Sequence, residues 1–366
     1  MRACMAVPRY PPNIRGGGET SCSLLVKELS KHLDIEVVSF DGHITGESKV
    51  DGIDVIRIKP TLSRSKMLLN AQACSFFKKK VDSYDIFHTY NMDLMPAIGH
   101  LTREYGIKSV ATLNGIVYSI SMSAYAHKHF SPKFYRNKSL IHILKKIDAF
   151  TALCPFYRDN WVKDGIPKEK IAVIPNMINL SLTTLDKKAS GTIRIVFVGN
   201  FANWRGLDIL LQAYSSLEKQ DIELTIVGDG WEKYMENKIE NIKNNIKFMG
   251  GVPYQKIPQI YVEADILVQP YRYPVPIGRS LIEALRSQVC VITAGDDYYS
   301  PVIKDMEHGV LIYPMDPEKL AEKIQMLIDD PALRERLAKN GKNMVYETCS
   351  PEVIVKRYLE VYEGLI

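Results

Sequence analysis

The chain has 366 residues, of which 46% are hydrophobic and 24% are charged. This composition is that of an ordinary globular protein with enough apolar material for two domain cores, and it excludes a disordered or low-complexity protein. The net charge of +5 is too small to indicate nucleic-acid binding by itself, and no nucleic-acid-binding motif accompanies it.

Short apolar runs alternate with longer amphipathic stretches along the chain. The strand-like runs of the first half are Ala3–Val7, Ile35–Phe40, Ile86–His88, Ser109–Leu113, Ala149–Leu153 and Ala172–Ile174. Those of the second half are Ile193–Val198, Glu223–Val227, Ile266–Gln269, Val289–Thr293 and Val310–Tyr313. The helical patterns between them include Thr20–His32, Met67–Val81, Leu207–Leu217, Trp231–Ile242, Ser280–Arg286 and Glu318–Ile328. This alternation predicts an α/β fold of parallel sheets covered by helices on both faces.

A segment without apolar periodicity, Leu180–Thr192, separates two rounds of this alternation. It is expected to be an interdomain linker, because a new strand-like run begins directly after it. The expected first domain, linker and second domain are residues 1–178, 179–192 and 193–349. Residues 350–366 are expected to form a last helix, because Ser350 can cap it and proline suits its first position.

Three consecutive glycines, Gly16, Gly17 and Gly18, connect the proline-rich loop after the first strand to a helix. Glycines at this point let backbone N–H groups approach a ligand closely, and a helix N-terminus favours an anion. The first turn of a doubly wound sheet is also a common ligand position. The spacing is not that of a G-x-G-x-x-G dinucleotide fingerprint. The loop is therefore expected to face a phosphate or a sugar, with a flexible turn as the alternative.

The second domain begins with a strand that ends in a sharp Gly199-Asn200 turn, and Arg205 opens the helix that follows. The loop is short, so Arg205 is expected at the carboxyl edge of the sheet, where open α/β sheets bind ligands. A guanidinium in this place can hold a diphosphate bidentately. An arginine at a solvated helix start is the alternative.

A later helix begins after Gly278, and its first turn carries Arg279, Ser280 and Glu283. The free backbone N–H groups at residues 278–280 can bind a phosphate. Glu283, one turn further along the helix, can accept both hydroxyls of a ribose. A solvated helical glutamate is the alternative.

The residues described so far resemble the GT-B-fold retaining glycosyltransferases of family 4. The resemblance covers nearly the whole chain and is carried by six pieces in the family's order: YPPNIRGGGE, DIFH, KIAVIPN, VFVGNFANWRG, LTIVGDG and PIGRSLIEAL. No single piece is specific, but their joint order and spacing are. The resemblance implies two Rossmann-like, doubly wound domains facing across a cleft, with the terminal helix crossing back onto the first domain.

The resemblance also implies roles for individual residues in holding a nucleotide-sugar donor. Glu283 corresponds to the ribose-binding glutamate, and Arg205 to the basic residue that meets the diphosphate. Gly16 and Gly17 would contribute backbone donors from the opposite domain. Retention without a protein nucleophile would let a donor phosphate oxygen take the proton of the acceptor hydroxyl.

The sequence departs from the family pattern at three positions that concern the sugar. The glutamate expected eight positions before Glu283 is Val275, and the arginine expected after the glycine of VFVGN is Asn200. The histidine often found near the sugar is replaced by Asn114. Both asparagines can still donate hydrogen bonds.

Glycosyl transfer needs groups that stabilise the negative charge developing on the leaving diphosphate. Arg205 and Asn200 are expected to serve this purpose, together with the helix N-terminus after Gly278. Arg279 can add positive charge, and Asn114 is the catalytic candidate of the first domain. The chain contains no Asp-x-Asp motif, so we expect neither a metal ion nor another cofactor.

Positive charge is concentrated in the first half of the chain. Residues 1–180 carry 25 Lys and Arg against 16 Asp and Glu, and Tyr105–Ile147 contains no acidic residue at all. Aromatic side chains among its lysines suggest contact with an anionic membrane surface or a lipid-diphosphate acceptor, and a merely solvated basic face is the alternative. His88 could point at the acceptor, or it could be a core histidine.

The cysteine pattern and the length of the apolar runs indicate the cellular compartment of the protein. The six cysteines form no Cys-x-x-Cys pair, which favours buried thiols in a reducing compartment over a disulfide framework or a zinc site. No apolar run approaches the roughly 18 residues needed to span a membrane. We expect a cytoplasmic protein that could attach peripherally to the inner face of the membrane.

The sequence therefore predicts a hexosyltransferase that moves a sugar from a nucleotide-diphosphate sugar to the hydroxyl of a saccharide or lipid-linked acceptor, with retention of anomeric configuration, in glycan or glycolipid assembly. Two alternatives stay open. One is a catalytically degenerate relative that binds a nucleotide or a partner, which the changes at Val275 and Asn114 favour. The other is a two-domain Rossmann enzyme such as a sugar-nucleotide epimerase.

Overall fold

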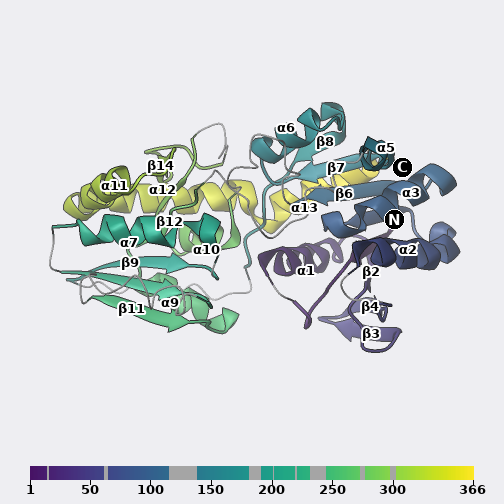
Figure 1. Cartoon of the computed structure of the whole chain (residues 1–366), viewed down its shortest axis with the longest axis horizontal. Helices are drawn as coiled ribbons and strands as arrows, with labels where there is room; N and C mark the ends of the chain where they lie inside the picture. The colour runs from purple at the N-terminus through teal and green to yellow at the C-terminus, as the bar shows by residue number, and fades with distance from the viewer. Residues whose placement is uncertain are drawn as a thin grey trace. The chain divides into compact units, whose positions relative to one another are not determined.

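The computed structural model describes residues 1–14, 16–61, 65–114, 138–180, 191–200, 202–218, 221–230, 245–272, 277–296 and 302–366. The chain divides into two compact units, each built around one sheet (Figure 1). The first unit is Met1–Met177 with Pro351–Ile366, and the second is Ile178–Ser350. The helix expected over Trp231–Ile242 lies outside the described residues.

The first unit holds an eight-stranded sheet with the strand order β3-β4-β2-β1-β5-β6-β7-β8. Its strands are β1 (Arg2–Val7), β2 (Asp34–Ser39), β3 (Gly46–Val50), β4 (Ile53–Arg57), β5 (Ile86–Thr89), β6 (Ser109–Leu113), β7 (Ala149–Ala152) and β8 (Ile171–Val173). Neighbouring strands are parallel except β3 and β4. The predicted doubly wound, parallel α/β class is therefore confirmed for the body of this sheet.

Helices cover both faces of the first sheet. One face packs against α1 (Gly17–Leu29) and α13 (Pro351–Glu363), the helix that follows the second unit in sequence. The other face packs against α2 (Lys66–Phe77), α3 (Met95–Tyr105), α5 (Lys138–Leu144) and α6 (Pro155–Lys163). The terminal helix thus belongs to the core of the first unit.

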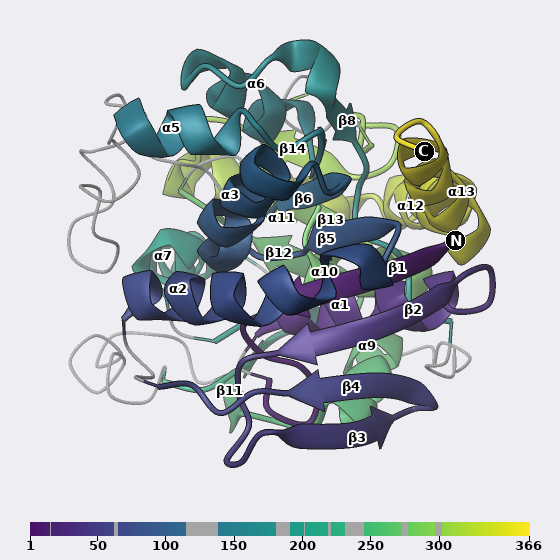
Figure 2. The same ribbon diagram turned by 90° about the vertical axis from the view of Figure 1, so that its right-hand side faces the viewer.

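An antiparallel hairpin forms one edge of the first sheet, beyond β2 (Figure 2). It was not expected from the strand–helix alternation. Asp51 and Gly52 link the two strands, and both have positive φ, 50° and 84°. A two-residue turn with two positive φ angles matches the twist of antiparallel strands, which is why Asp-Gly is a common hairpin sequence.

The second unit holds a fully parallel six-stranded sheet with the order β11-β10-β9-β12-β13-β14. Its strands are β9 (Ile193–Val198), β10 (Ile222–Val227), β11 (Ile246–Gly250), β12 (Ile266–Gln269), β13 (Cys290–Ala294) and β14 (Val310–Ile312). The strand order reverses between β9 and β12, and in such sheets ligands bind beyond the carboxyl ends of the strands near this point.

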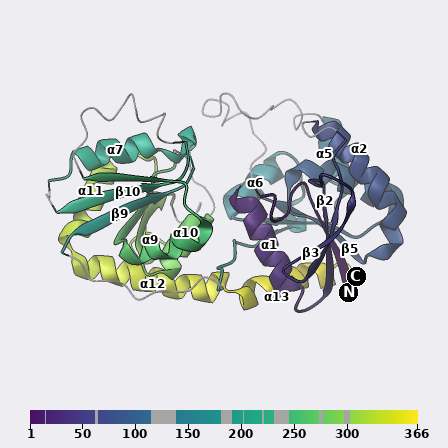
Figure 3. The same ribbon diagram turned by 90° about the horizontal axis from the view of Figure 1, so that it is seen from below.

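Helices also cover both faces of the second sheet, as Figure 3 shows for α7 against α9 and α10. One face packs against α7 (Leu207–Ser215) and α11 (Pro317–Asp329), and the other against α9 (Ile257–Glu263) and α10 (Arg279–Arg286). The long helix α12 (Pro331–Cys349) contributes to both apolar clusters. Among the described residues, no helix is long and apolar enough to cross a membrane.

A buried polar network joins α13 to the first sheet. His88 on β5 is fully buried, and its Nδ1 lies 2.6 Å from the Tyr362 hydroxyl. Its Nε2 lies 2.9 Å from Oγ1 of Thr112, which in turn lies 2.8 Å from Oγ1 of Thr151. Both ring nitrogens have hydrogen-bond partners, as buried polar groups usually do, so His88 is a fully satisfied histidine of the core.

This buried histidine is expected to make stability depend on pH. Burial lowers the pKa of His88 from 6.5 to about 3. Between these values the unfolded chain binds a proton that the folded chain does not, so the free energy of unfolding falls as the pH drops, by at most about 1.4 kcal/mol per pH unit. We expect His88→Gln to weaken this dependence. Urea unfolding at pH 7.5, 6.5 and 5.5 measures it.

The matched control is His32→Gln, because His32 is an exposed histidine of the same unit. It should keep the wild-type dependence on pH. If His88→Gln lost stability with falling pH as steeply as the wild type, the buried histidine would not be its source.

Candidate functional site

Tight glycine turns follow β9 and β10 at the carboxyl edge of the second sheet. The Gly199 N–H donates to the Val227 carbonyl at 2.8 Å, and the Gly228 N–H donates to the Gly250 carbonyl at 2.8 Å. Gly228 has a φ of 134°, and a Cβ on it would lie 2.2 Å from the Gly199 carbonyl oxygen. No side chain fits between these turns, so backbone packs directly on backbone there.

Arg205 lies on this glycine surface. It ends a short 3-10 turn, η5 (Asn203–Arg205), and Gly206 follows with a φ of 68°. A Cβ on Gly199 would lie 2.3 Å from the Arg205 Nη1, so the guanidinium rests against the turn after β9. This is the carboxyl edge at which the short loop predicted the arginine.

Aromatic stacking and an ion pair hold the Arg205 turn. The Arg205 Cζ lies 4.8 Å from the ring centroid of Trp204, whose ring is 5.3 Å from that of Tyr271. Arg272 donates to the Asn203 carbonyl from Nε at 3.0 Å and pairs with Asp208 at 2.5 Å. The loop after β12 thus fixes the loop after β9.

Tyr271 also connects Arg205 to the first turn of α10. Burial raises the pKa of Tyr271, while the Arg205 charge and a hydrogen bond from the Ser280 side chain oppose this shift. The Ser280 carbonyl in turn accepts from the Tyr261 hydroxyl at 3.0 Å. Arg205, Tyr271 and Ser280 are therefore neighbours at one edge of the sheet.

Glu283 lies one turn further along α10 in a largely buried cluster. Its Oε1 accepts from the Tyr254 hydroxyl at 2.6 Å and from the Arg279 Nη2 at 2.9 Å. The Glu283 and Arg279 side chains are 11% and 13% exposed. Burial raises the pKa of the Glu283 carboxyl, and the Arg279 charge and the Tyr254 hydrogen bond act against that shift.

The contacts run from Arg205 through Trp204 and Tyr271 to Ser280 in the first turn of α10, and Glu283 lies one turn further along the same helix. The two side chains predicted to hold opposite ends of one ligand therefore belong to a single cluster of the second unit. Gly278 precedes α10 in an extended conformation, and as the N-cap residue it has no side chain that could cap the helix. The first-turn N–H groups are thus not occupied by an N-cap side chain.

Two further predicted residues of the second unit have protein partners. Arg279 does not point past the helix N-terminus but turns along the helix onto Glu283, four residues later. Such pairs form readily because side chains four positions apart lie on the same helix face. Asn200 accepts the Asp229 N–H on Oδ1 at 3.2 Å. Val275 lies outside the described residues.

In the first unit, the glycine loop and Asn114 lie at the same sheet edge. Gly16 precedes α1, which begins at Gly17, and a Cβ on Gly18 would lie 3.7 Å from the Asn114 Nδ2. That Nδ2 donates to the Tyr90 carbonyl at 2.9 Å. One amide hydrogen of Asn114 is thus already in use.

An ion pair that the sequence did not point to holds the proline-rich loop before the glycines. Arg57 Nη1 lies 2.9 Å from the Asp41 Oδ1, and the other carboxylate oxygen accepts the Tyr10 N–H at 3.0 Å. Arg57 also donates to the carbonyls of Tyr10 and Pro11. This charge-assisted clasp fixes the start of the loop to β2 and β4.

His88 does not face a ligand site. Its ring is fully buried, and both nitrogens are engaged by Tyr362 and Thr112. Of the two interpretations of this residue, an acceptor contact and a core histidine, the structure gives the second. Residues 115–137 of the stretch Tyr105–Ile147 that suggested membrane contact lie outside the described residues, and they include its aromatic residues from Tyr118 to Tyr135.

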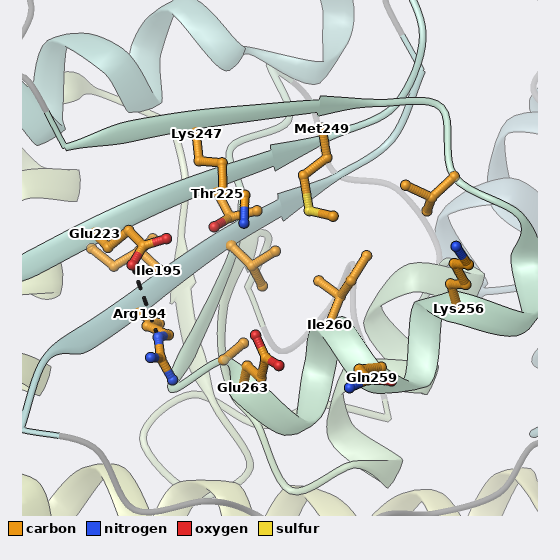
Figure 4. Close-up of a pocket in the computed structure, with 13 residues that line it drawn as sticks. Arg194, Ile195, Glu223, Thr225, Lys247, Met249, Lys256, Gln259, Ile260 and Glu263 are labelled. Carbon is orange, nitrogen blue, oxygen red and sulfur yellow. Dashed lines mark ion pairs between the residues drawn. The ribbon is translucent and has the colours of Figure 1, made fainter.

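A cavity of about 390 Å³ lies elsewhere in the second unit, on the sheet face beside α9 (Figure 4). Its lining combines charged side chains, including the ion pair of Arg194 with Glu223 at 3.9 Å, with apolar ones such as Val196 and Ile260. Neither Arg205 nor Glu283 lines it. This cavity is thus separate from the cluster at the carboxyl edge.

The sequence matches two glycosyltransferase families in succession. Residues 15–182 match Glycosyltransferase Family 4, and residues 186–344 match Glycosyl transferases group 1. An uncharacterized glycosyltransferase of Methanocaldococcus jannaschii is 24% identical over 396 residues, covering 99% of this chain and 98% of that protein.

Solved structures share the fold over the full length. Sucrose-phosphate synthase from Thermosynechococcus elongatus matches with a TM-score of 0.82 at 18% identity, covering 100% of this chain and 99% of that one. The Anabaena protein HepE, in complex with UDP and glucose, matches with a TM-score of 0.79 at 16% identity, covering 99% of this chain and 100% of that one. With two family matches that together span residues 15–182 and 186–344, the chain belongs to the GT-B glycosyltransferases of family 4 type.

Proposed function

We propose that this glycosyltransferase moves a hexose from a nucleoside-diphosphate sugar to an acceptor hydroxyl with retention of anomeric configuration. The observation that carries the proposal is the continuous cluster of the second unit, which joins Arg205 to the first turn of α10 through Tyr271 and Ser280. In the proposal, Arg205 and the N–H groups at residues 278–280 hold the diphosphate, and Glu283 holds the ribose.

The same groups would stabilise the leaving nucleoside diphosphate. As the bond between the anomeric carbon and the phosphate oxygen breaks, negative charge grows on the diphosphate beside the fixed guanidinium of Arg205 and the positive end of the α10 dipole. The acceptor oxygen forms the new bond to the anomeric carbon, and its proton passes to a phosphate oxygen of the donor. Neither a metal ion nor another cofactor is part of this proposal.

The acceptor side is assigned to the first unit, whose sheet edge also carries Gly16 and Gly17 as candidate contacts of the donor and Asn114 as the catalytic candidate. The excess of Lys and Arg in residues 1–180 supports an acidic or lipid-linked saccharide as acceptor. The same positive charge supports peripheral binding of the protein to an anionic membrane surface. We place the protein in the cytoplasm, in glycan or glycolipid assembly.

A calorimetric titration with UDP, GDP and ADP, followed by their glucose, mannose and N-acetylglucosamine donors, tests the proposal. We expect one nucleoside diphosphate to bind, and its sugar donor to be consumed only slowly without an acceptor. Nucleotide binding without transfer to any acceptor would instead indicate a degenerate relative. Absence of binding to all three nucleotides would refute the donor site.

Removing the guanidinium should act on the diphosphate selectively. We expect Arg205→Ala to weaken UDP binding by roughly ten- to a hundredfold, because a charge-assisted hydrogen bond contributes about 1.5–3 kcal/mol. Uridine binding should change by less than about threefold in the same variant. Calorimetry with both ligands measures the difference, and Arg336→Ala, which changes an exposed arginine of α12, is the matched control. Equal losses for UDP and uridine would refute the phosphate role.

Removing the carboxylate should act on the nucleoside end. We expect Glu283→Ala to weaken binding of both uridine and UDP at least roughly tenfold, because both contain the ribose. Glu322→Ala, an exposed position of α11, should leave both affinities unchanged. Unchanged uridine affinity in Glu283→Ala would show that the ribose assignment is wrong.

A methyl group on the glycine surface should displace Arg205 without removing it. A Cβ at Gly199 would lie 2.3 Å from the Arg205 Nη1, so the guanidinium must move. We expect Gly199→Ala to weaken UDP binding by about tenfold while uridine affinity stays within about twofold. Gly191→Ala is the control, since a Cβ there meets nothing within 4 Å. Wild-type UDP affinity in Gly199→Ala would contradict the placement of the guanidinium.

A further inference from the structure

Tyr254 stands between the two charged side chains of α10. Its hydroxyl donates to the Glu283 Oε1 at 2.6 Å and also contacts the Arg279 Nη2. The Arg279 Cζ lies 5.0 Å from the centroid of the Tyr254 ring, so the guanidinium stacks on the tyrosine that it shares with the glutamate. Three side chains thus close one compact triangle.

Tyr254 comes to this triangle from a separate element. It begins the 3-10 turn η6 (Tyr254–Lys256), which follows β11, and it packs against the apolar cluster beneath α9 and α10. A hydrogen bond from Asn179, at the start of the second unit, also reaches it. Burial raises the pKa of Tyr254 to about 12, so the phenol keeps its proton and acts as a donor at neutral pH.

The triangle uses only one of the two carboxylate oxygens. Both hydrogen bonds that Glu283 accepts from described residues end on Oε1. A carboxylate oxygen has two lone pairs, so the Tyr254 hydroxyl and Arg279 together occupy Oε1. The carboxylate is thereby fixed in rotation, and its remaining capacity for donors lies on Oε2.

We propose that Tyr254 is a positioning residue that, together with Arg279, holds Glu283 so that Oε2 faces the ribose hydroxyls of the donor nucleotide. This inference rests on the proposed donor site. A glutamate side chain loses conformational entropy when it is fixed. Because Tyr254 and Arg279 already fix Glu283 in the free protein, ligand binding does not have to supply this free energy. Preorganisation of this kind raises affinity for a ribose that donates to the carboxylate and does nothing for a sugar without hydroxyls.

A purely structural role for Tyr254 makes a different prediction. If the tyrosine only supported the packing of η6 against α10, its loss would weaken every nucleotide to the same extent. The ligand pair that separates the two roles is UDP and 2′,3′-dideoxy-UDP, or the corresponding GDP or ADP pair if the titration selects that base. Because the two ligands differ only in the ribose hydroxyls, the ratio of their affinities reports on the contacts to those hydroxyls, and the loss of that ratio in Glu283→Ala assigns them to Glu283.

The experiment measures both affinities by calorimetry for the wild type, Tyr254→Phe and Tyr214→Phe. Tyr214→Phe is the matched control, because its hydroxyl donates to the Ile222 carbonyl at 3.1 Å within the same unit. We expect Tyr254→Phe to weaken UDP about three- to tenfold and dideoxy-UDP by less than about twofold. Tyr214→Phe should keep the wild-type ratio. An unchanged ratio in Tyr254→Phe would overturn the inference.

Two outcomes separate this inference from the donor site beneath it. In the first outcome, the wild type prefers UDP over dideoxy-UDP, Glu283→Ala loses this preference and Tyr254→Phe retains it. The positioning role of Tyr254 is then refuted, whereas the ribose assignment of Glu283 stands. If the wild type shows no preference, or binds none of the three nucleotides, the ribose assignment fails and the inference fails with it.

If Tyr254→Phe does not fold, a crystal structure of the wild type with UDP tests the positioning role instead. Ribose hydroxyls on Oε2, with Tyr254 still donating to Oε1, would support the positioning role. A hydroxyl on Oε1, with the tyrosine displaced, would overturn it.

Discussion

Contact between backbone and backbone at the carboxyl edge of the second sheet determines where a cation can lie in this unit. The turns at Gly199 and Gly228 approach so closely that a single Cβ on Gly228 would come within 2.2 Å of a carbonyl oxygen. The space that side chains would take above Gly199 is instead filled by the guanidinium of Arg205. In the proposed donor site, a positive charge on bare backbone lets an anion bind without displacing a side chain.

Rigid groups connect this cation to the rest of the site. The rings of Trp204 and Tyr271, which pack at a tilt of 31°, join the loops after β9 and β12, and the hydrogen bond between Ser280 and Tyr271 extends the connection to α10. Aromatic rings have few rotatable bonds, so the spacing between Arg205 and α10 is set by the sheet and by stacking. A ligand that reaches from the cation to Glu283 must therefore match a length fixed by the scaffold, which is how a rigid site selects one size of ligand.

The sequence predicted those features that depend on local pattern. Alternating strands and helices predicted the fold class, and the short loop after β9 predicted an arginine at the sheet edge. The hairpin at Asp51 and Gly52 was missed, although the Asp-Gly pair is its signal, because the parallel pattern dominated the interpretation. Tyr254 was missed for a physical reason: it lies 29 residues before Glu283 in a short turn without a motif, and only the tertiary fold brings the two together.

The direction of Arg279 could not be predicted either, because two favourable partners competed for it. The helix N-terminus would bind an anion beside the guanidinium, whereas Glu283, four residues later, offers a charge on the same helix face. The intrahelical pair leaves neither of these two largely buried charges without a partner. A sequence pattern records which partners are possible, but the balance between them depends on burial, which arises only from the fold.

Two buried polar clusters among the described residues, around His88 and around Glu283, differ in what they leave open to a ligand. In the first unit, His88 is fully enclosed and both its nitrogens have partners, so nothing remains to recognise a ligand and the cluster serves to join α13 to the sheet. In the second unit, Glu283 keeps 11% of its side chain exposed, and its described hydrogen bonds all fall on one oxygen. A carboxylate with hydrogen bonds on one oxygen is held in a fixed orientation, while its other oxygen can still accept hydrogen bonds. This difference, more than burial or a shifted pKa, is why we propose Glu283 and not His88 as a ligand-binding group, because both side chains are buried and both have shifted pKa values.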